Sequence, residues 1–496
     1  MPRLSTQTLE LVQPDVARPA YDFQRTGIGH VHFGVGAFMR AFVATCSDDA
    51  LASKGGDWGI AGVSLRQKTV SDQLEPQDCL YSLATLDNDS TAYRLIGAIR
   101  SIDVAPDHPQ RIIELLAAPS VHVVTITVTE KGYGLAPDSG ELDRSNPDIE
   151  RDLQDLREPR SLLGFLVAGL RLRRDTVGVP LTIVSCDNLP DNGKRLRNGV
   201  LTFADEVDEN LRAWIESSVS FPATMVDRIT PATTVQDLDA AEQFLGLRDE
   251  ALVKAEPFLQ WVIENDFKAA RPYWEAGGAL LVDDVRPYEV AKLQLLNGPH
   301  SALAYLGYLA GHEFVSDVMQ QPEFANYIRL LMSREISPAT AEPAGMEHAR
   351  YIDALLHRFE NAALRHRTWQ IAMDGSQKLP QRLLNTLRSQ LKRGGPIAGL
   401  SLAVAAWMRY VLGNDEAGRP IDVQDPLLDD FVRMRSLASG DAEDVVSQFI
   451  DLKQVFGTDL AKDGRFTSTL AGQYRLLVEK GAAGAVRDYV GSSGGL

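Results

Sequence analysis

Nine residues of this chain, Lys292 through His300, bring a lysine, an asparagine and a histidine together in an otherwise mostly apolar segment. At about 100° per residue, Asn297 lies about 140° around a helix from Lys292, and His300 lies about 80° from it. The three side chains can therefore border one pocket. A lysine in an apolar wall has its charged form disfavoured, so its pKa falls towards that of a useful general base. The alternative is a helix end with a surface lysine and a capping asparagine.

The dipeptide Gly298-Pro299 lies inside this segment. Proline removes a backbone donor and clashes with the preceding turn of a helix. The sequence therefore predicts a kink between Asn297 and His300.

Length and charge limit the class of protein. At 496 residues the chain exceeds one ordinary core, which predicts two domains. A net charge of −17 argues against a nucleic-acid scaffold and means that an anionic substrate needs a local basic site. Cys46, Cys79 and Cys186 form no disulfide framework and no zinc spacing, which favours a reducing cytoplasm. Residues 1–19 do not resemble a signal peptide, and residues 397–412 are too short for a membrane span and indicate a buried helix.

The two halves of the chain differ in their hydrophobic patterns. In the first half we expect strands at residues 30–33, 58–65, 121–129 and 181–186, and helices at residues 38–52 and 162–174. This alternation predicts a mostly parallel sheet covered on both faces. After about residue 285 we expect helices at residues 293–309, 351–364, 381–391, 400–412 and 442–452, and a loop at residues 337–346. The second domain is therefore predicted to be all-helical.

Gly34-Val35-Gly36 lies between the first predicted strand and the first helix. In that place a dinucleotide pyrophosphate rests on the N-terminus of the helix. Met39 stands where the third glycine of the usual fingerprint would be, so a plain tight turn is the alternative. After the second strand come Arg66 and Lys68, with Asp72 as the nearest acid. An acid directly after the second strand selects NAD, whereas a cation accommodates the 2′-phosphate of NADP. NADP therefore stays open as the cofactor, and the alternative is that both cations are simply solvated.

Three further segments carry polar side chains that fit a ligand site. Residues 127–133 and 185–190 each follow a predicted strand, and such loops line the ligand crevice of a parallel sheet. Asn188 can donate to a substrate oxygen, although turns also favour Asp-Asn. Asp227 can accept from substrate hydroxyls, or else form a surface pair with Arg228. Basic residues 365–378 can neutralise a carboxylate, or else form a solvated helix face.

Metal chemistry has no support in the sequence. His30 and His32 lie in a predicted buried strand and are interpreted as structural residues. No His, Asp and Glu cluster has metal-ligand spacing, so hydride transfer here would run without zinc.

Taken in order, these motifs resemble those of the polyol-specific long-chain dehydrogenases, the family of mannitol 2-dehydrogenase and fructuronate reductase (D-mannonate oxidoreductase). The resemblance covers nearly the whole chain. It rests on residues 32–38, 129–133, 185–188, 225–228, 256–258 and 292–300.

The resemblance implies an NAD(P)-dependent enzyme with an α/β Rossmann-type N-terminal domain, residues 1–285, and an all-helical C-terminal domain, residues 286–496. The active site would lie in the cleft between them. Lys292 would be the general base, Asn188 and Asn297 would hold the reacting oxygen, and His300 would orient the substrate. Substrate contacts are expected from Asp227, Lys378, Arg367 and Lys131. Cofactor contacts, with NAD expected and NADP left open, are expected from Gly34, Gly36, Phe38, Arg40, Arg66, Thr129 and Glu130.

Three positions depart from the family pattern. Residues 39–42 read Met-Arg-Ala-Phe where the family usually has His-Arg-Ala-His. Pro299 stands where many members have serine, which affects the backbone near His300. Lys68 and Thr69 replace the acids that mark NAD preference in the mannitol enzymes.

The substrate is left open between two types. Residues 187–190 resemble the mannitol enzymes, whereas residues 130–133 and 366–382 resemble the fructuronate reductases. Extra cations at Lys131, Arg365 and Arg367 suit the carboxylate of a hexonate. We therefore expect a cytoplasmic, monomeric dehydrogenase that interconverts a C2 secondary alcohol and a ketone, with no nucleic-acid or membrane partner. Another polyol such as D-arabinitol, or a non-catalytic nucleotide or sugar sensor on the same fold, is the alternative.

Overall fold

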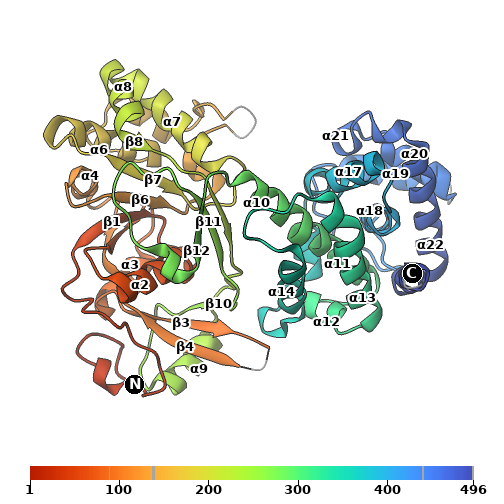
Figure 1. Cartoon of the computed structure of the whole chain (residues 1–496), viewed down its shortest axis with the longest axis horizontal. Coiled ribbons are helices and arrows are strands. Elements are labelled where there is room, and N and C mark those ends of the chain that lie inside the picture. Colours follow the sequence, from red (N-terminus) through yellow and green to blue (C-terminus); the bar gives the residue numbers. More distant parts are fainter. Residues whose placement is uncertain (89, 137–139, 438–440, 494–496) are drawn as a thin grey trace. The chain divides into compact units, whose positions relative to one another are not determined.

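The computed structural model describes residues 1–88, 90–136, 140–437 and 441–493. The chain divides into two compact units, Met1–Arg286 and Pro287–Leu496. The first unit contains the sheets and the second is built from helices (Figure 1).

A six-stranded parallel sheet forms the centre of the first unit. Its order is β5-β2-β1-β6-β7-β8, and each neighbouring pair is parallel. The strands are β1 (Ile28–Phe33), β2 (Gly59–Ser64), β5 (Ile99–Val104), β6 (Val123–Ile126), β7 (Leu181–Ser185) and β8 (Val219–Ser220). The strand order reverses between β1 and β6, as in doubly wound dinucleotide-binding folds, where ligands bind at that reversal. The predicted mostly parallel sheet is confirmed.

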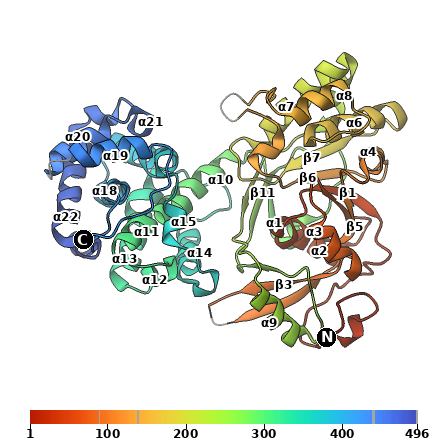
Figure 2. The same ribbon diagram turned by 180° about the vertical axis from the view of Figure 1, so that it is seen from behind.

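Helices cover both faces of this sheet because its strands are apolar on both sides. Along β1, Val31 and Phe33 pack with α4, α6, α7 and α8, whereas the intervening His30 and His32 face the opposite side. Figure 2 shows these four helices on one side of the sheet and α1–α3 on the other. The helices are α1 (Ala37–Ala41), α2 (Val43–Lys54), α3 (Thr69–Leu74), α4 (Pro109–Ala117), α5 (Pro147–Gln154), α6 (Leu162–Thr176), α7 (Asn192–Val207), α8 (Glu209–Ser218) and α9 (Val235–Leu245).

Two three-stranded sheets, which the sequence patterns did not predict, complete the first unit. One has the order β10-β3-β4, and the other has the order β12-β11-β9. Their strands are β3 (Tyr81–Leu86), β4 (Thr91–Ile96), β9 (Thr224–Asp227), β10 (Val253–Ala255), β11 (Gln260–Glu264) and β12 (Ala279–Val282).

Two predicted elements have different limits in the structure. The single helix predicted over residues 38–52 is two helices, because Phe42 has non-helical backbone angles (φ −125°, ψ −78°) between α1 and α2. The strand predicted over residues 121–129 is confined to β6, and Thr127 begins the loop that follows it.

The second unit is helical throughout its named elements within residues 287–437 and 441–493, as predicted. Helix α18 (Ala398–Val411) is almost wholly buried, so the apolar segment at residues 397–412 is a core helix (Figure 2). The other helices that Figure 1 labels or that border the site are α10 (Arg286–Ala291), α11 (Gly298–Leu309), α12 (Val315–Met319), α13 (Pro322–Leu330), α14 (His348–Glu360), α15 (Thr368–Ala372), α16 (Gly375–Leu379), α17 (Asn385–Arg393), α19 (Leu428–Leu437), α20 (Ala442–Ile450), α21 (Lys453–Phe456) and α22 (Gly464–Ser493), which is kinked at Gly481.

Three turns in the described residues of the second unit are π-helical, with hydrogen bonds that span five residues. They are η5 (Lys292–Asn297), η6 (Leu331–Ile336) and η9 (Pro380–Leu384). Such turns are rare and occur frequently at functional sites.

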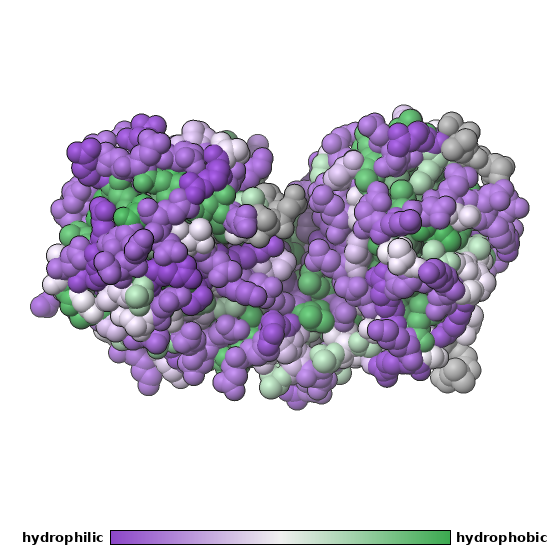
Figure 3. All heavy atoms as spheres, turned by 90° about the horizontal axis from the view of Figure 1, so that it is seen from above, coloured by the Kyte–Doolittle hydropathy of each residue, from purple (hydrophilic) through white to green (hydrophobic). Residues whose placement is uncertain are grey.

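The surface agrees with a composition rich in charged residues. Hydrophilic residues dominate the face drawn in Figure 3, as a net charge of −17 leads one to expect. No helix in the described part of the chain has the length and apolar character needed to cross a bilayer.

Candidate functional site

The turn that leaves β1 depends on two glycines for different reasons. Gly34 has φ +94°, and a Cβ there would lie 1.9 Å from the carbonyl oxygen of Thr127. Gly36 has an ordinary φ of −79°. A Cβ on Gly36 would meet no protein atom within 4 Å, and this glycine lines a cavity. Gly34 is therefore required by the backbone, whereas Gly36 keeps space open for a ligand, as a dinucleotide-binding turn requires.

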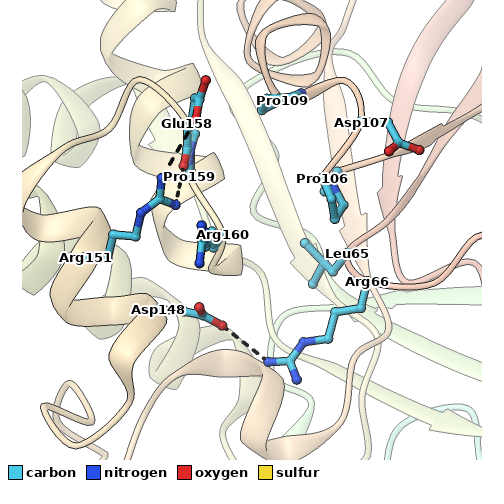
Figure 4. Close-up of a pocket in the computed structure, with 11 residues that line it drawn as sticks. Leu65, Arg66, Pro106, Asp107, Pro109, Asp148, Arg151, Glu158, Pro159 and Arg160 are labelled. Carbon is cyan, nitrogen blue, oxygen red and sulfur yellow. Dashed lines mark hydrogen bonds and ion pairs between the residues drawn. The ribbon is translucent and has the colours of Figure 1, made fainter.

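Two neighbouring cavities lie along the carboxyl ends of the parallel strands. One, of about 550 Å³, is lined by the glycine turn and by the loops after β2 and β6. The other, of about 640 Å³, is lined by the loops after β2 and β5 and by residues 158–160 (Figure 4). Both include Leu65, Arg66, Asp148 and Arg160, so together they form one trough. This trough fits an extended dinucleotide with its pyrophosphate at the glycine turn.

Of the seven residues predicted to contact the cofactor, Gly34, Gly36, Arg66 and Thr129 line the trough. Phe38, Arg40 and Glu130 are absent from its lining. Phe38 stacks on Phe42, and Arg40 is buried, where it donates to the carbonyl oxygen of Ala251 at 2.5 Å. Arg40 thus fixes α1 within the fold. Glu130 begins an exposed turn after β6.

The two cations that follow β2 are both engaged by acids. Arg66 lies 3.6 Å from the carboxylate of Asp148, as Figure 4 shows, and Lys68 lies 2.7 Å from that of Asp107. A 2′-phosphate would have to compete with these carboxylates for the cations.

The two histidines of β1 form one hydrogen-bonded chain with threonines of β6 and its following loop. Thr125 Oγ1 lies 2.6 Å from His30 Nε2 and 2.6 Å from His32 Nδ1. His32 Nε2 lies 2.9 Å from Thr127 Oγ1, which donates to the carbonyl oxygen of Gly34 at 2.8 Å. The chain therefore ends on the glycine turn and holds it in place, which agrees with a structural role for both histidines.

The loop after β7 carries Asn188 beside a half-buried acid. Asp187 Oδ2 accepts hydrogen bonds from Tyr133 Oη at 2.5 Å and from the backbone N–H of Val128 at 3.1 Å. Asn192 donates to the carbonyl oxygen of Asp187 at 3.0 Å and to that of Thr224 at 2.9 Å. The first residue of β9 is therefore tied to this loop, which presents Asn188 at the carboxyl end of β7.

Replacing Asp187 by asparagine is expected to stabilise the protein at pH 8. Burial raises the pKa of the Asp187 carboxyl from 3.8 to about 6. A raised folded-state pKa means that folding favours the protonated acid, so its stabilising effect is complete below about pH 4 and is lost as pH rises through about 6. The loss at pH 8 is at most about 3 kcal/mol, and an asparagine amide keeps an acceptor for Tyr133. Urea unfolding at pH 5 and pH 8 measures the difference.

The exposed Asp266→Asn variant is the matched control and should unfold as the wild type does at both pH values. A D187N protein less stable than wild type at pH 8 would contradict the burial argument.

Asp227 and Arg228 do not form the surface pair that was the alternative at the sequence level. Asp227 ends β9 and is buried. Arg228 donates to the carbonyl oxygens of Glu256 and Ala41, at 2.9 Å and 2.5 Å. Asp227 is therefore held at a strand end, as a substrate-binding acid requires.

In the second unit, η5 holds Lys292 and Asn297 in one widened turn. The backbone N–H of Gly298 bonds to the carbonyl oxygen of Leu293, five residues earlier, so the turn has more residues than an α-helical turn and Asn297 lies nearer to Lys292 around the axis. The separation of about 140° expected for an α-helix is therefore wrong for this pair. This widened turn stands directly before Pro299, where the kink was predicted, and Gly298 itself is helical (φ −61°, ψ −61°). Lys292 is buried, with 7 % of its surface exposed.

Gly298 marks where η5 and η9 touch. A Cβ on Gly298 would lie 2.7 Å from the carbonyl oxygen of Arg382, a residue of η9. The missing side chain allows the two π-turns to approach, so segment 292–300 lies against segment 380–384.

His300 lies in an aromatic and cationic environment. Its ring stacks on Phe359 at 5.2 Å and meets the ring of His366 edge-on at 4.7 Å. Burial, followed by repulsion from His366 and from nearby Arg382, lowers the pKa of His300 well below its usual value. The imidazole is therefore neutral at pH 7 and can exchange hydrogen bonds with a substrate hydroxyl.

Two cations close to His300 come from residues 375–384. Lys378 donates to the carbonyl oxygen of Met373 at 2.5 Å, and burial together with Arg382 lowers its pKa. Arg382 donates to Ser301 Oγ at 3.1 Å, and burial lowers its pKa too. Lys378 was predicted as a substrate residue. Arg382 and the buried Arg358, which also repels protonated His300, were not predicted, although Arg382 ends a segment that resembles the fructuronate reductases.

Three further cations, Arg365, Arg367 and Lys131, were expected to suit a substrate carboxylate. Arg367 is exposed, forms an ion pair with Glu313 at 3.3 Å and lies 5.8 Å from the ring of Phe314. Arg365 lies over the same ring at 4.8 Å. Lys131 lines the dinucleotide trough of the first unit. Among the described side chains, no group of three or more His, Cys, Asp or Glu is arranged to hold a metal ion.

Comparison with known proteins accounts for nearly the whole chain. Residues 28–276 match the mannitol dehydrogenase Rossmann domain, and residues 284–478 match the mannitol dehydrogenase C-terminal domain. The D-mannonate oxidoreductase of Escherichia coli is 42 % identical over 94 % of this chain and 96 % of its own length. Pseudomonas fluorescens mannitol 2-dehydrogenase, solved as a ternary complex with NAD and D-mannitol, is 36 % identical with a TM-score of 0.79, covering 99 % of each chain.

A D-sorbitol dehydrogenase structure is 30 % identical with a TM-score of 0.90, covering 97 % of this chain and 100 % of its own. The Rossmann domain and the C-terminal domain of the family are thus both present in this chain, in that order. The chain is an oxidoreductase of the mannitol dehydrogenase family.

Proposed function

We propose that this protein is an NAD-dependent dehydrogenase that interconverts a C2 secondary alcohol and a ketone of a linear polyol or sugar acid. The substrate is of the mannitol and fructose type or of the D-mannonate and D-fructuronate type. The observation that carries the proposal is the π-turn η5, because it holds a buried lysine and an asparagine in one turn, three residues before the neutral His300.

Each side chain has a distinct role in the proposal. In oxidation Lys292 takes the proton of the substrate hydroxyl at its Nζ, and in reduction it returns that proton to the carbonyl oxygen. Asn188 and Asn297 donate hydrogen bonds to the same oxygen as its charge develops. His300, Asp227 and Lys378 orient the remaining hydroxyl groups. The proposal therefore requires residues of both units to act on one substrate.

The trough of the first unit is proposed to hold the cofactor. A nicotinamide dinucleotide bound there supplies the hydride acceptor for oxidation and the hydride donor for reduction. NAD is favoured over NADP because Asp148 and Asp107 already engage Arg66 and Lys68, so a 2′-phosphate would meet carboxylates as well as cations. No metal takes part in the proposed reaction. The proposal also includes action as a monomer in the cytoplasm. The sparse and unpaired cysteines favour a reducing compartment.

Initial rates in both directions test this function. D-Mannitol and D-mannonate are offered with NAD⁺ and NADP⁺, and D-fructose and D-fructuronate with NADH and NADPH. Turnover of either pair, faster with NAD(H) and unaffected by EDTA, is the expected result. Tight dinucleotide binding without turnover of these substrates or of D-arabinitol would instead indicate a sensor.

A further inference from the structure

We propose that Arg382, together with Lys378, binds a carboxylate of the substrate, so that the substrate is a sugar acid rather than an uncharged polyol. This inference rests on the proposed function and names the substrate class of the same site. Neither the glycine turn nor the lysine and asparagine residues discriminate between these classes, because in both the reacting carbon is the secondary carbon next to a terminal CH2OH group.

The geometry places Arg382 against the segment that carries the catalytic groups. Its carbonyl oxygen lies where a Gly298 side chain would be, and its guanidinium donates to Ser301 Oγ, the residue after His300. In the described part of the chain no carboxylate lies within ion-pair distance of this guanidinium, although burial penalises its charge. One N–H group bonds to Ser301, and a guanidinium has five. The remaining donors are available to an anion of planar shape.

The charge around His300 favours the same conclusion. Arg358, Lys378 and Arg382 all repel a proton on His300, as does His366. Beside Lys378, the carboxylate of Asp374 lies 3.9 Å away and is half exposed. Buried cations are stabilised by paired anions. A substrate carboxylate would supply that anion and would be held in two-point contact by the guanidinium.

The position along the helix suits a sugar acid of this type. His300 follows Lys292 by eight residues, a rise of about 12 Å in a helix. In D-fructuronate the carboxylate is at the end of the carbon chain opposite to the C2 carbonyl. A group that binds the carboxylate therefore belongs away from Lys292 along the segment, where Arg382 lies beside Ser301. Arg367 and Arg365, which lie at Phe314, are not needed for this role.

The test compares the ratio of kcat/KM for D-mannonate to kcat/KM for D-mannitol in wild type and in variants. Wild type should favour the acid. Arg382→Leu should lower the ratio at least about 30-fold, chiefly through the KM of the acid, because a charge-assisted pair is lost. Arg382→Lys should recover part of the ratio. In Arg382→Ala, added guanidinium chloride should restore the rate with the acid more than the rate with the polyol.

Arg393→Leu is the matched control, because it removes an exposed arginine from the end of the same helical segment. It should leave the ratio unchanged. Equal losses with both substrates in Arg382→Leu, with no recovery in Arg382→Lys or with guanidinium, would show a structural role and overturn the inference. A wild type that favours D-mannitol would overturn it while leaving the dehydrogenase function intact. Absence of turnover with both compounds would instead count against the proposed function.

Discussion

Replacing Lys292 by alanine is expected to lower kcat at least about 1,000-fold in both directions, because a positioned acid or base typically contributes 10²- to 10⁴-fold. Lys292 belongs to η5, whereas the trough proposed to hold the dinucleotide is lined by residues of the first unit. The dissociation constant for NADH should therefore change less than about threefold. Steady-state rates and titration of NADH fluorescence measure the two quantities separately.

Two further variants isolate the role of the amine. Lys292→Met keeps most of the buried side-chain volume and should be as inactive as alanine, which separates loss of the amine from loss of packing. Lys392→Ala removes an exposed lysine at the end of α17 and should be fully active. Near wild-type turnover by either Lys292 variant would eliminate Lys292 as the acid and base.

A methyl group added at Gly34 should destabilise the first unit by about 3 kcal/mol, whereas one added at Gly36 should leave its stability nearly unchanged. At Gly34 an alanine must adopt φ +94° with its Cβ 1.9 Å from the oxygen of Thr127, so the backbone has to move. At Gly36 the new Cβ meets no protein atom within 4 Å but occupies the lining of the trough. Gly36→Ala should therefore weaken NADH binding about tenfold or more.

Urea unfolding and NADH titration of both variants test this contrast. The two glycines are one residue apart, so each variant is the control for the other. If Gly34→Ala were as stable as wild type, the close approach of the turn to Thr127 would be disproved. Unchanged NADH affinity in Gly36→Ala would contradict dinucleotide binding at this turn.

The sequence predicted the elements whose hydrophobic pattern is local. Strands β6 and β7 are buried on both faces and read as continuous apolar runs. The small sheets were missed because their pairing is not local. Leu83 of β3 pairs with Val253 of β10, far along the chain, and β4 is half exposed and partly polar. The break at Phe42 interrupts a pattern that remains helical on either side.

At the candidate site, the sequence predicted which motifs are present but not which side chains contact one another in the folded protein. The glycine turn was recognised because the spacing of its glycines and its place between a strand and a helix are local features of the sequence. The π-turn was not, since its widened hydrogen bonding accompanies Pro299 and the contact of Gly298 with Arg382. Charge composition marked residues 365–378 as basic. Only the packing of η9 against η5 shows that Arg382 contacts Ser301 beside His300, whereas Arg367 lies over Phe314.

The chain of hydrogen bonds from His30 to the glycine turn fixes the tautomer of both imidazoles. Thr127 gives its single hydroxyl proton to Gly34, so it must accept from His32 Nε2, which leaves Nδ1 of that ring bare. Thr125 then gives its proton to His32 Nδ1 and accepts from His30 Nε2. The remaining atom, His30 Nδ1, is thereby unprotonated, and it is buried without a hydrogen-bond partner.

A second proton on either imidazole would place two hydrogen-bond donors against each other or would put a charge in the core. Burial accordingly lowers the pKa of His30 to about 3. The direction of these hydrogen bonds is therefore the same throughout the pH range in which an ordinary histidine titrates. The conformation of the turn that faces the trough is insulated from pH, and ¹⁵N chemical shifts should show both rings as Nε2–H tautomers from mildly acidic to alkaline solution.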